Sequence, residues 1–460
     1  ELKPNYDFIL GNLLHTRMHL CIWNEFSSLL SKLTYKINND EKVVVPFPLL
    51  ALIDEPEIQK KTTEIYVNER YPINYIFPKI DLYPKHSKIK VGYFSPDFRK
   101  HPVSNLTAQL YEMHDRNNFE VHAFSYGLDI KDEMNLRIKA GVDYFHYVNS
   151  KSDKEIVMLA RSFEIDIAVD LAGFTKDSRP GIFAMSAAPI QTSYIGYLGT
   201  MGSEYYNYLL ADQIIIPERN KKYYSEKIAY LPSYQVNDST VSLPENIFTR
   251  QDIGLPEKGF VFCCFNSTYK ITPTTFDSWG RILKHVDGSV LLIYADNESA
   301  KINLTKEIIH RGIHPSRLIF GKRLPPLEYL SRYRVADLFL DTQPYNAGAT
   351  ASDALRMGLP VLTFIGNSFS SRIAASLINA LSLPELITSS SAEYESLAIH
   401  LAIYPEKLKI IKDKLIKNLL TSPLYDAALF TRHLESAYFS MYDKYQNRLE
   451  PDHIYVKLEK

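Results

Sequence analysis

The stretch that decides the fold is residues 335–364, which read VADLFLDTQPYNAGATASDALRMGLPVLTF. The pattern predicts a short apolar strand (337–340), a turn of small residues (345–350), a helix from about Thr350 to Gly358, and a second buried strand (360–364). A strand, a Gly/Ala-rich turn and a helix N-terminus form an anion site, because free N–H groups and the helix dipole face the ligand. Asp353, one turn inside that helix, is placed to accept two ribose hydroxyls. The alternative is an ordinary crossover with a solvated capping Asp.

Composition narrows the class of protein. The chain has 460 residues, which predicts two or three domains, and its 52 Lys+Arg against 53 Asp+Glu give no reason to expect nucleic acid as a partner. Three cysteines (Cys21, Cys263 and Cys264) do not make a disulfide framework or a metal site. No apolar run is long enough for a membrane span and no signal peptide is visible, so we expect a cytoplasmic protein.

The order of elements predicts an α/β protein with two doubly wound domains. Strands alternate with helices from residue 88 and, after a loop-rich stretch, again from residue 259, which indicates parallel sheets with helices on both faces. The expected segments are listed here: a helical segment and linker (1–87), a first Rossmann-like lobe (88–250), a second Rossmann-like lobe (251–422), and a C-terminal helix that packs back across the lobes (423–460). Ligands of such sheets bind beyond the carboxyl ends of the strands, and the cleft between two lobes is the default site.

Polar residues follow four predicted strands. His101 precedes a helix start and could reach a phosphate or a reacting hydroxyl, although a surface turn His is the simpler interpretation. Asp170 ends an apolar run and is costly to bury unless it is paired or faces a polar cleft. Lys270 lies at the mouth of the most apolar strand and could neutralise a diphosphate; the alternative is a solvated loop Lys. The fourth strand end is the Thr350/Asp353 turn.

Several chemistries lack their motifs. The chain has no G-x-S-x-G, P-loop or H-E-x-x-H motif, and neither domain opens on G-x-G-x-x-G. No D-x-D stands at a strand end, so no metal site for a sugar nucleotide is indicated. A metal-free diphosphate site would need cations and backbone N–H groups, which Lys270 and the 345–350 turn supply.

These residues resemble a known family. The chain resembles the O-linked N-acetylglucosamine transferases, especially the bacterial homologues, because it carries a set of their motifs in the same order. These motifs are FRKHPVS (98–104), DLAGFTK (170–176), APIQ (188–191) with GYLGT (196–200), YSEK (224–227), the stretches 265–271 and 336–353, and SRIAAS (371–376). The resemblance covers essentially residues 89–446. It implies a GT-B fold with the donor in the C-terminal lobe, and inversion at the anomeric carbon without a metal.

The resemblance also implies roles on the donor side. Lys270 would contact the donor diphosphate, with Ser267 beside it, and Asp353 would take the ribose. Tyr329 falls where the animal enzymes stack a His on uracil. Arg332 falls on an Arg that the family has on the side of the nucleotide base. The diphosphate would also bind the turn formed by Gly348, Ala349 and Thr350.

On the acceptor side, His101 falls on the active-site His of the family. The stretches around Asp170 and Gly196–Thr200 would line the cleft, with Gly173, Thr175, Gly199 and Thr200 as its expected lining residues. The general base stays open among His101, Asp170 and a relay to the donor phosphate.

The chain departs from the family in four places, one of which is the absence of the long insert between the animal enzymes' two lobes. The family's His-Thr-Thr turn is Gly348-Ala349-Thr350 here, so one side-chain contact to the diphosphate is lost. The family often has a His just before the Asp170 motif, and this chain has Asp166 at that position. Only the helical segment near the N-terminus stands where the family carries tetratricopeptide repeats, and no 34-residue period is visible.

We therefore expect a transferase that moves N-acetylglucosamine from a UDP donor to Ser or Thr of a protein. No cofactor or metal is expected, since the UDP-sugar is a substrate, and the partners are that donor and a protein acceptor. Relatives that use UDP-glucose on Asn or GDP-fucose on Ser/Thr, a sugar-nucleotide-binding protein without turnover, and a two-lobed epimerase are the alternatives.

Overall fold

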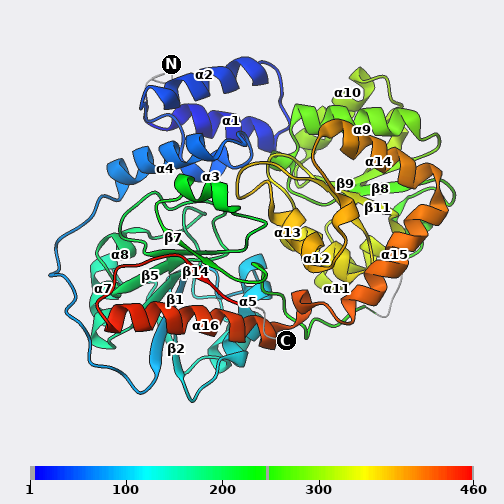
Figure 1. The fold of residues 1–460 in the computed structure, drawn as a ribbon. Coiled ribbons are helices and arrows are strands. Elements are labelled where there is room, and N and C mark those ends of the chain that lie inside the picture. Colours follow the sequence, from blue (N-terminus) through cyan, green and yellow to red (C-terminus); the bar gives the residue numbers. More distant parts are fainter. Residues whose placement is uncertain (1–5, 245–247, 458–460) are drawn as a thin grey trace. The chain divides into compact units, whose positions relative to one another are not determined.

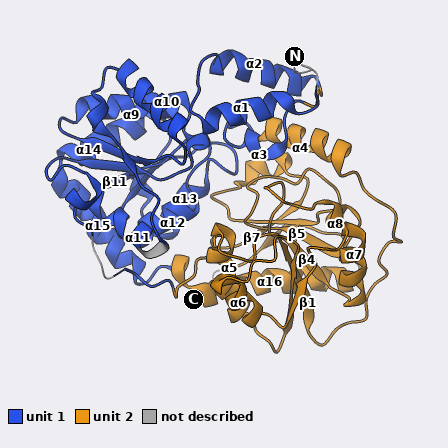
Figure 2. Cartoon of the chain, turned by 180° about the vertical axis from the view of Figure 1, so that it is seen from behind, with its two compact units in different colours: residues 1–39, 43–55, 241–422 blue, residues 40–42, 56–240, 423–460 orange. Residues whose placement is uncertain are grey.

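The computed structural model describes residues 6–244 and 248–457, so the outermost residues of both predicted terminal segments lie outside the described residues. The chain forms two compact units (Figure 2): unit 1 comprises residues 1–39, 43–55 and 241–422, and unit 2 comprises 40–42, 56–240 and 423–460. This division cuts through the expected N-terminal segment, because its first helices pack on unit 1 and its last helix belongs to unit 2. Residues 423–460 join unit 2.

Unit 2 contains an eight-stranded sheet in which every strand pair is parallel (Figure 1). Its order is β14 (Ile454–Tyr455), β7 (Lys227–Tyr230), β6 (Tyr208–Ala211), β5 (Ile190–Ser193), β4 (Ile167–Asp170), β1 (Ile89–Ser95), β2 (Phe119–Ser125), β3 (Tyr144–Tyr147). Its helices are α4 (Pro56–Arg70), α5 (Pro102–Met113), α6 (Glu133–Ala140), α7 (Asp153–Ser162), α8 (Gly181–Ala184) and α16 (Ala427–Gln446).

The centre of this sheet is buried on both faces, as expected of parallel strands covered by helices. All four residues of β4 are buried, and so is β1 except for Lys90. From β1 the chain builds β2 and β3 on one side and β4 onward on the other. The topological switch point therefore lies between β1 and β4, where the carboxyl ends of strands diverge and ligands bind in such sheets.

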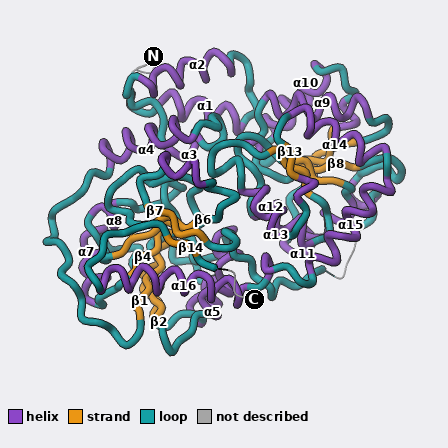
Figure 3. Tube along the Cα trace, in the orientation of Figure 1, coloured by secondary structure: helices purple, strands orange, loops and turns teal. Residues whose placement is uncertain are grey.

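Unit 1 contains a six-stranded parallel sheet enclosed by helices (Figure 3). Its order is β10 (Leu318–Gly321), β9 (Val290–Tyr294), β8 (Val261–Cys264), β11 (Leu338–Leu340), β12 (Val361–Phe364), β13 (Ile387–Thr388). The α-helices that follow its first strand are α9 (Pro273–His285), α10 (Glu298–His310), α11 (Pro326–Ser331), α12 (Ala349–Arg356), α13 (Ile373–Ala380), α14 (Ser391–Ile403) and α15 (Pro405–Leu419). Its switch point lies between β8 and β11.

Helices α1 (Ile9–His19), α2 (Phe26–Asn38) and α3 (Pro46–Leu49) belong to unit 1. The indole of Trp23 packs edge-on against Phe276 of α9, with ring centroids 5.3 Å apart. The backbone carbonyl of His19 accepts hydrogen bonds from Thr268 Oγ1 (2.9 Å) and Asn297 Nδ2 (3.1 Å). The N-terminal helices are thus fixed to loops that follow strands of the unit 1 sheet.

Helix α16 packs on α5 and β5 within unit 2. Its Glu435 accepts a hydrogen bond from the buried His114 ring (2.9 Å) and another from the backbone N–H of Asp115 (2.8 Å). In the part of the chain that the structure describes, no helix has the length and apolar character that crossing a membrane requires.

Candidate active site

Lys270 ends a single turn of 3-10 helix (Thr268–Lys270) that follows β8. Its Nζ donates to the backbone carbonyl of Asn346 (3.1 Å) and lies 3.7 Å from the centre of the Tyr345 ring, which is a cation–π contact. Burial lowers the pKa of Lys270 to about 8, against the opposing effects of Asp341 and Cys264. The ammonium is therefore still charged at neutral pH and is held at the carboxyl end of β8.

The first turn of α12 lies at the neighbouring strand end. Gly348 is its N-cap and no side chain caps the helix, so the first backbone N–H groups are not used by a capping residue. The hydroxyl of Thr350 donates to Asn266 Oδ1 (2.5 Å), and Asn266 Nδ2 donates to Thr342 Oγ1 (2.8 Å). Asn266 thereby joins the end of β8 to the turn after β11, a bridge that the sequence did not reveal.

Asp341 is the second residue of this site that the sequence analysis missed. Its Oδ1 accepts from the backbone N–H groups of Thr342 (2.8 Å) and Ala347 (2.7 Å), and its Oδ2 accepts from the hydroxyl of Thr363 (2.7 Å). The carboxyl group is buried, which raises its pKa to about 6. Asp341 fixes the shape of the 342–347 turn and so the position of the α12 N-terminus.

Asp353, Tyr329 and Arg332 form a second group in unit 1. Burial raises the pKa of Asp353 to about 6, partly offset by Arg356, the hydroxyl of Tyr329, and Arg332. The buried Arg332 guanidinium lies 3.8 Å from the Phe265 ring centre and 4.4 Å from that of Tyr329. Of the predicted donor residues, these three are brought together by α11, the turn after it, and α12.

Ser267 is exposed and is the N-cap residue of the Lys270 turn without a side-chain cap bond. Its carbonyl accepts from Lys270 N (3.0 Å). The Ser267 hydroxyl is therefore positioned on the outer surface of the loop that carries Lys270.

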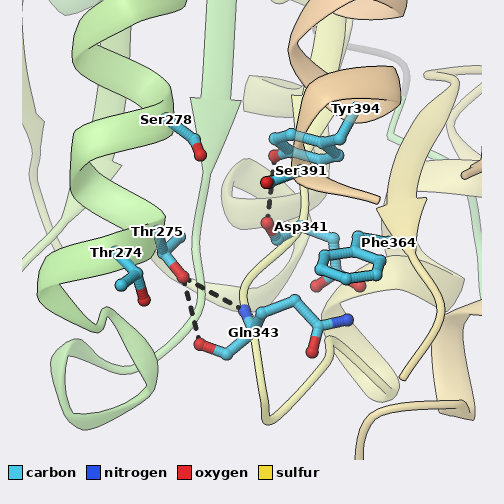
Figure 4. Close-up of a pocket in the computed structure, with 8 residues that line it drawn as sticks. All are labelled: Thr274, Thr275, Ser278, Asp341, Gln343, Phe364, Ser391 and Tyr394. Carbon is cyan, nitrogen blue, oxygen red and sulfur yellow. Dashed lines mark hydrogen bonds between the residues drawn. The ribbon is translucent and has the colours of Figure 1, made fainter. Parts of the chain in front are cut away.

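A small pocket of about 70 Å³ adjoins Asp341 (Figure 4). It is lined by Thr274, Thr275, Ser278, Asp341, Gln343, Phe364, Ser391 and Tyr394. Thr275 Oγ1 donates to the Gln343 carbonyl (3.0 Å) and Tyr394 OH donates to the Asp341 carbonyl (3.0 Å). None of the predicted donor residues lines this pocket, which lies between the N-terminal turns of α9 and α14.

In unit 2, His101 is the N-cap residue of α5, the helix that follows β1. Its Nδ1 accepts from the backbone N–H of Val103 (3.3 Å) and lies 3.5 Å from Asp97 Oδ2. Burial lowers the pKa of His101, with Asp97 opposing the shift. A neutral ring whose Nδ1 accepts carries its proton on Nε2, so this arrangement presents His101 as a hydrogen-bond donor.

Asp170 ends β4 at the switch point. Its Oδ1 accepts from the backbone N–H groups of Ala172 (2.9 Å) and Gly173 (3.0 Å), and its Oδ2 accepts from Tyr206 OH (2.5 Å). Gly173 has φ 56°, and a Cβ there would lie 2.4 Å from Tyr197 Cβ, so the turn requires glycine. Asp170 thus repeats in unit 2 the arrangement of Asp341 in unit 1: two turn N–H groups and one hydroxyl donate to a buried carboxylate.

The remaining predicted residues of unit 2 are engaged in local structure. Thr175 Oγ1 donates to the Ala172 carbonyl (2.8 Å). Thr200, next to Gly199 in the loop after β5, donates from its hydroxyl to the buried Glu226 (2.7 Å). Burial raises the pKa of Glu226. The structure therefore gathers His101 and Asp170 at the β1 and β4 ends of one sheet, and Thr200 serves to anchor its own loop.

Two doubly wound parallel sheets with this strand order are the architecture of the two-domain glycosyltransferase fold called GT-B. A model of glycosyl transferase family 41 matches residues 63–247 and 235–434, and this chain belongs to glycosyl transferase family 41. The predicted fold class, two Rossmann-like units with an N-terminal helical segment, is confirmed.

Similar proteins support the assignment of this chain to glycosyl transferase family 41. The chain is 31% identical over 466 residues to a probable UDP-N-acetylglucosamine–peptide N-acetylglucosaminyltransferase, SEC, of Arabidopsis thaliana, covering 96% of this chain and 48% of that protein. It is 26% identical over 486 residues to a Caenorhabditis elegans UDP-N-acetylglucosamine–peptide N-acetylglucosaminyltransferase, covering 80% of this chain and 42% of that protein. The chain thus spans about half the length of these relatives.

Among solved structures, a Thermobaculum terrenum O-GlcNAc transferase mutant matches with a TM-score of 0.83 and 25% identity, covering 97% of this chain and 86% of that one. The resemblance to the O-linked N-acetylglucosamine transferases is therefore confirmed. The site residues predicted by that resemblance stay predictions.

Proposed function

We propose that this chain transfers N-acetylglucosamine from UDP-N-acetylglucosamine to Ser or Thr hydroxyls of protein, by a single inverting displacement that uses no metal. The observation that carries the proposal is the pairing of a half-buried, charged Lys270 with the N-terminus of α12 at one switch point, with Asp353 in the same helix. The activities for which the relatives are named support the choice of donor and acceptor.

In the proposed reaction the acceptor oxygen attacks the anomeric carbon from the face opposite the diphosphate. The bond from that carbon to the β-phosphate oxygen breaks, UDP leaves with its electron pair, and the hydroxyl proton passes to a base. Lys270 and the first N–H groups of α12 would stabilise the negative charge that develops on the diphosphate. A well-placed donor of this kind contributes about 3–4 kcal/mol to the transition state.

Two residues, His101 and Asp170, are predicted as possible bases. Their surroundings favour the remaining alternative, in which the proton passes to the donor phosphate. A base must reach the acceptor proton with a free lone pair. Asp170 is buried and both its oxygens accept from local donors, and the Val103 N–H at His101 Nδ1 favours the tautomer with its proton on Nε2. We propose that His101 orients substrate as a donor through Nε2–H and that the hydroxyl proton passes to the donor phosphate. Asp170 would position the turn after β4.

The test is a transfer assay with donors labelled in the sugar. The chain is incubated with labelled UDP-N-acetylglucosamine, UDP-glucose or GDP-fucose and a mixture of proteins, and protein-bound label is tested for release by base, which cleaves sugar from Ser/Thr. Base-labile label from UDP-N-acetylglucosamine alone is the expected result. Label from another donor would change the assigned substrate, and a free UDP-sugar product without transfer would favour an epimerase.

A further inference from the structure

One half-buried carboxylate in unit 1, that of Asp54, has no place in the proposed chemistry. Asp54 lies between α3 and α4, far in sequence from every candidate site residue, and it contacts the loop 366–371 between β12 and α13, called here the serine loop. Its Oδ1 accepts from the backbone N–H (2.9 Å) and the hydroxyl (2.8 Å) of Ser368, and from the hydroxyl of Ser371 (2.5 Å). Its Oδ2 accepts from the backbone N–H of Asn367 (2.9 Å).

The serine loop is shaped to receive this carboxylate. A Cβ at Gly366 would lie 2.2 Å from Asp54 Oδ2, so glycine is required for the approach. Ser368, Ser370 and Ser371 are fully buried, and the Ser370 hydroxyl donates to the carbonyl of Leu50 (3.3 Å), in the same N-terminal segment as Asp54. Buried hydroxyls need partners, and the N-terminal segment provides them.

The serine loop in turn contacts the residues around Lys270. The carbonyl of Ser370 accepts from the backbone N–H of Asn346 (3.0 Å), and the carbonyl of Asn346 accepts from Lys270 Nζ (3.1 Å). A continuous path of hydrogen bonds therefore runs from Asp54 through the serine loop and Asn346 to the Lys270 ammonium.

We infer that Asp54 is a positioning residue for the donor diphosphate, acting through the serine loop and Asn346 on Lys270. The inference rests on the proposed function, because it takes Lys270 as the cation that meets the diphosphate. The inference assigns the segment before α4 to the donor site. In this view the Asp54 carboxylate, which lies outside the sheet, sets the position of the Lys270 ammonium.

The test substitutes Asp54→Asn, which keeps the shape but turns an NH₂ group toward donors. Glu55→Gln is the matched control, since this neighbouring carboxylate is exposed. Calorimetry measures UDP and uridine binding, and thermal unfolding checks the fold. We expect Asp54→Asn to weaken UDP binding about tenfold and uridine binding by less than about twofold, because only UDP meets Lys270.

A double-mutant cycle separates positioning from general structural damage. In a Lys270→Met background, Asp54→Asn should change UDP affinity by less than about twofold, because the group through which it acts is gone. Equal losses for UDP and uridine, a loss that persists in the Lys270→Met background, or no loss at all would overturn the inference. Ser371→Ala, which removes one donor to Asp54, gives the same pattern with a smaller loss if Asp54→Asn does not fold.

The outcomes also separate the two proposals. If the wild-type chain binds no UDP, both the proposed function and this inference fail. If wild type and Asp54→Asn bind UDP equally well, only the inference fails.

Discussion

Lys270 is a cation that the fold keeps partly desolvated. Its ammonium lies over Tyr345 and donates to a backbone carbonyl, and burial brings its pKa down to about 8. A partly desolvated charge interacts more strongly with a diphosphate than a solvated one, because the local dielectric constant is lower. The effect is lost if the charge is removed.

Lys270→Met should therefore abolish most transfer while the fold survives. Methionine keeps the length of the side chain and removes the ammonium, and we expect a loss of about a hundredfold to a thousandfold in kcat. Initial rates of transfer measure the effect, and Lys258→Met, at an exposed lysine of unit 1, is the control. A rate within about tenfold of wild type would remove Lys270 from the mechanism.

Asp353→Asn tests the ribose contact. Asparagine keeps one acceptor oxygen but places an NH₂ group where the second hydroxyl needs an acceptor. Hydrogen bonds to charged groups contribute about 1.5–3 kcal/mol each, so UDP affinity should fall roughly tenfold to a hundredfold. UDP and the UDP-sugar should lose equally, since the contact is to the ribose. Unchanged UDP binding in calorimetry would show that Asp353 does not meet the ribose.

At the scale of the element, the same arrangement ends a strand in both sheets. β4 ends in Asp170 and β11 is followed by Asp341, and each carboxylate accepts from two backbone N–H groups of the next turn and from one hydroxyl. Each Asp is next to the switch point of its sheet. The repetition supports a positioning role for both residues.

Asp170→Asn separates a positioning residue from a general base. The amide oxygen can still accept from Ala172 and Gly173, and the NH₂ group can donate to the Tyr206 oxygen. We expect kcat to stay within about tenfold of wild type, whereas general base catalysis contributes about 10²–10⁴-fold. Asp170→Ala, which removes the acceptors, should instead lower the melting temperature. A thousandfold loss of kcat in a normally folded Asp170→Asn variant would restore Asp170 as the base.

Much of the unit 1 site could be predicted from local sequence. The helix α12 and strands β11 and β12 lie within a residue or two of the ranges expected for 335–364, because Gly358 and Pro360 end the helix and the strands are short apolar runs. The bridging role of Asn266 could not be predicted, since it depends on which strands are neighbours. Asp54 was missed because its partner Ser368 is 314 residues away.

The unit 2 sheet contains strands that the pattern did not indicate. β5 reads Ile-Gln-Thr-Ser, yet all four residues are buried. The Gln191 amide is satisfied by the carbonyls of Phe183 and Tyr205 and by the N–H of Ala187. Burial of this glutamine depends on tertiary partners, which hydrophobic periodicity does not detect.

For the whole molecule, we expect the affinity for UDP to fall at both high and low pH. Lys270 loses its proton as pH rises through about 8, so affinity for the UDP diphosphate should fall above that pH. Asp353 gains a proton as pH falls through about 6, so its ribose contact should weaken below that pH. Calorimetry with UDP from pH 5 to 9 should give a plateau between about 6 and 8.

Uridine is the control for this profile. It lacks phosphates, so its affinity should keep the acidic decline and lose the alkaline one, and Asp353→Asn should remove the acidic decline. An alkaline decline of the same size for uridine would assign that limb to a group other than Lys270.

Chelation tests the metal-free proposal for the molecule as a whole. A saturating chelator should leave the transfer rate unchanged, because Lys270 and the α12 N–H groups are proposed to carry the charge compensation that Mg²⁺ provides elsewhere. Rates are compared with and without chelator, and then with Mg²⁺ or Mn²⁺ added back. Activity that disappears on chelation and returns with either ion would contradict the proposal.

Apart from the short stretch 40–42, the chain passes from one unit to the other near residues 55, 240 and 422. Helices α1 to α3 are separated from the strands of their own unit by about two hundred residues of chain, most of which belong to unit 2. Unit 2 in turn lacks α16 and its edge strand β14 until residues 427–455 are made, after the sheet of unit 1. Neither unit can therefore complete its core until most of the other unit has been synthesised, so each remains incompletely folded for part of synthesis.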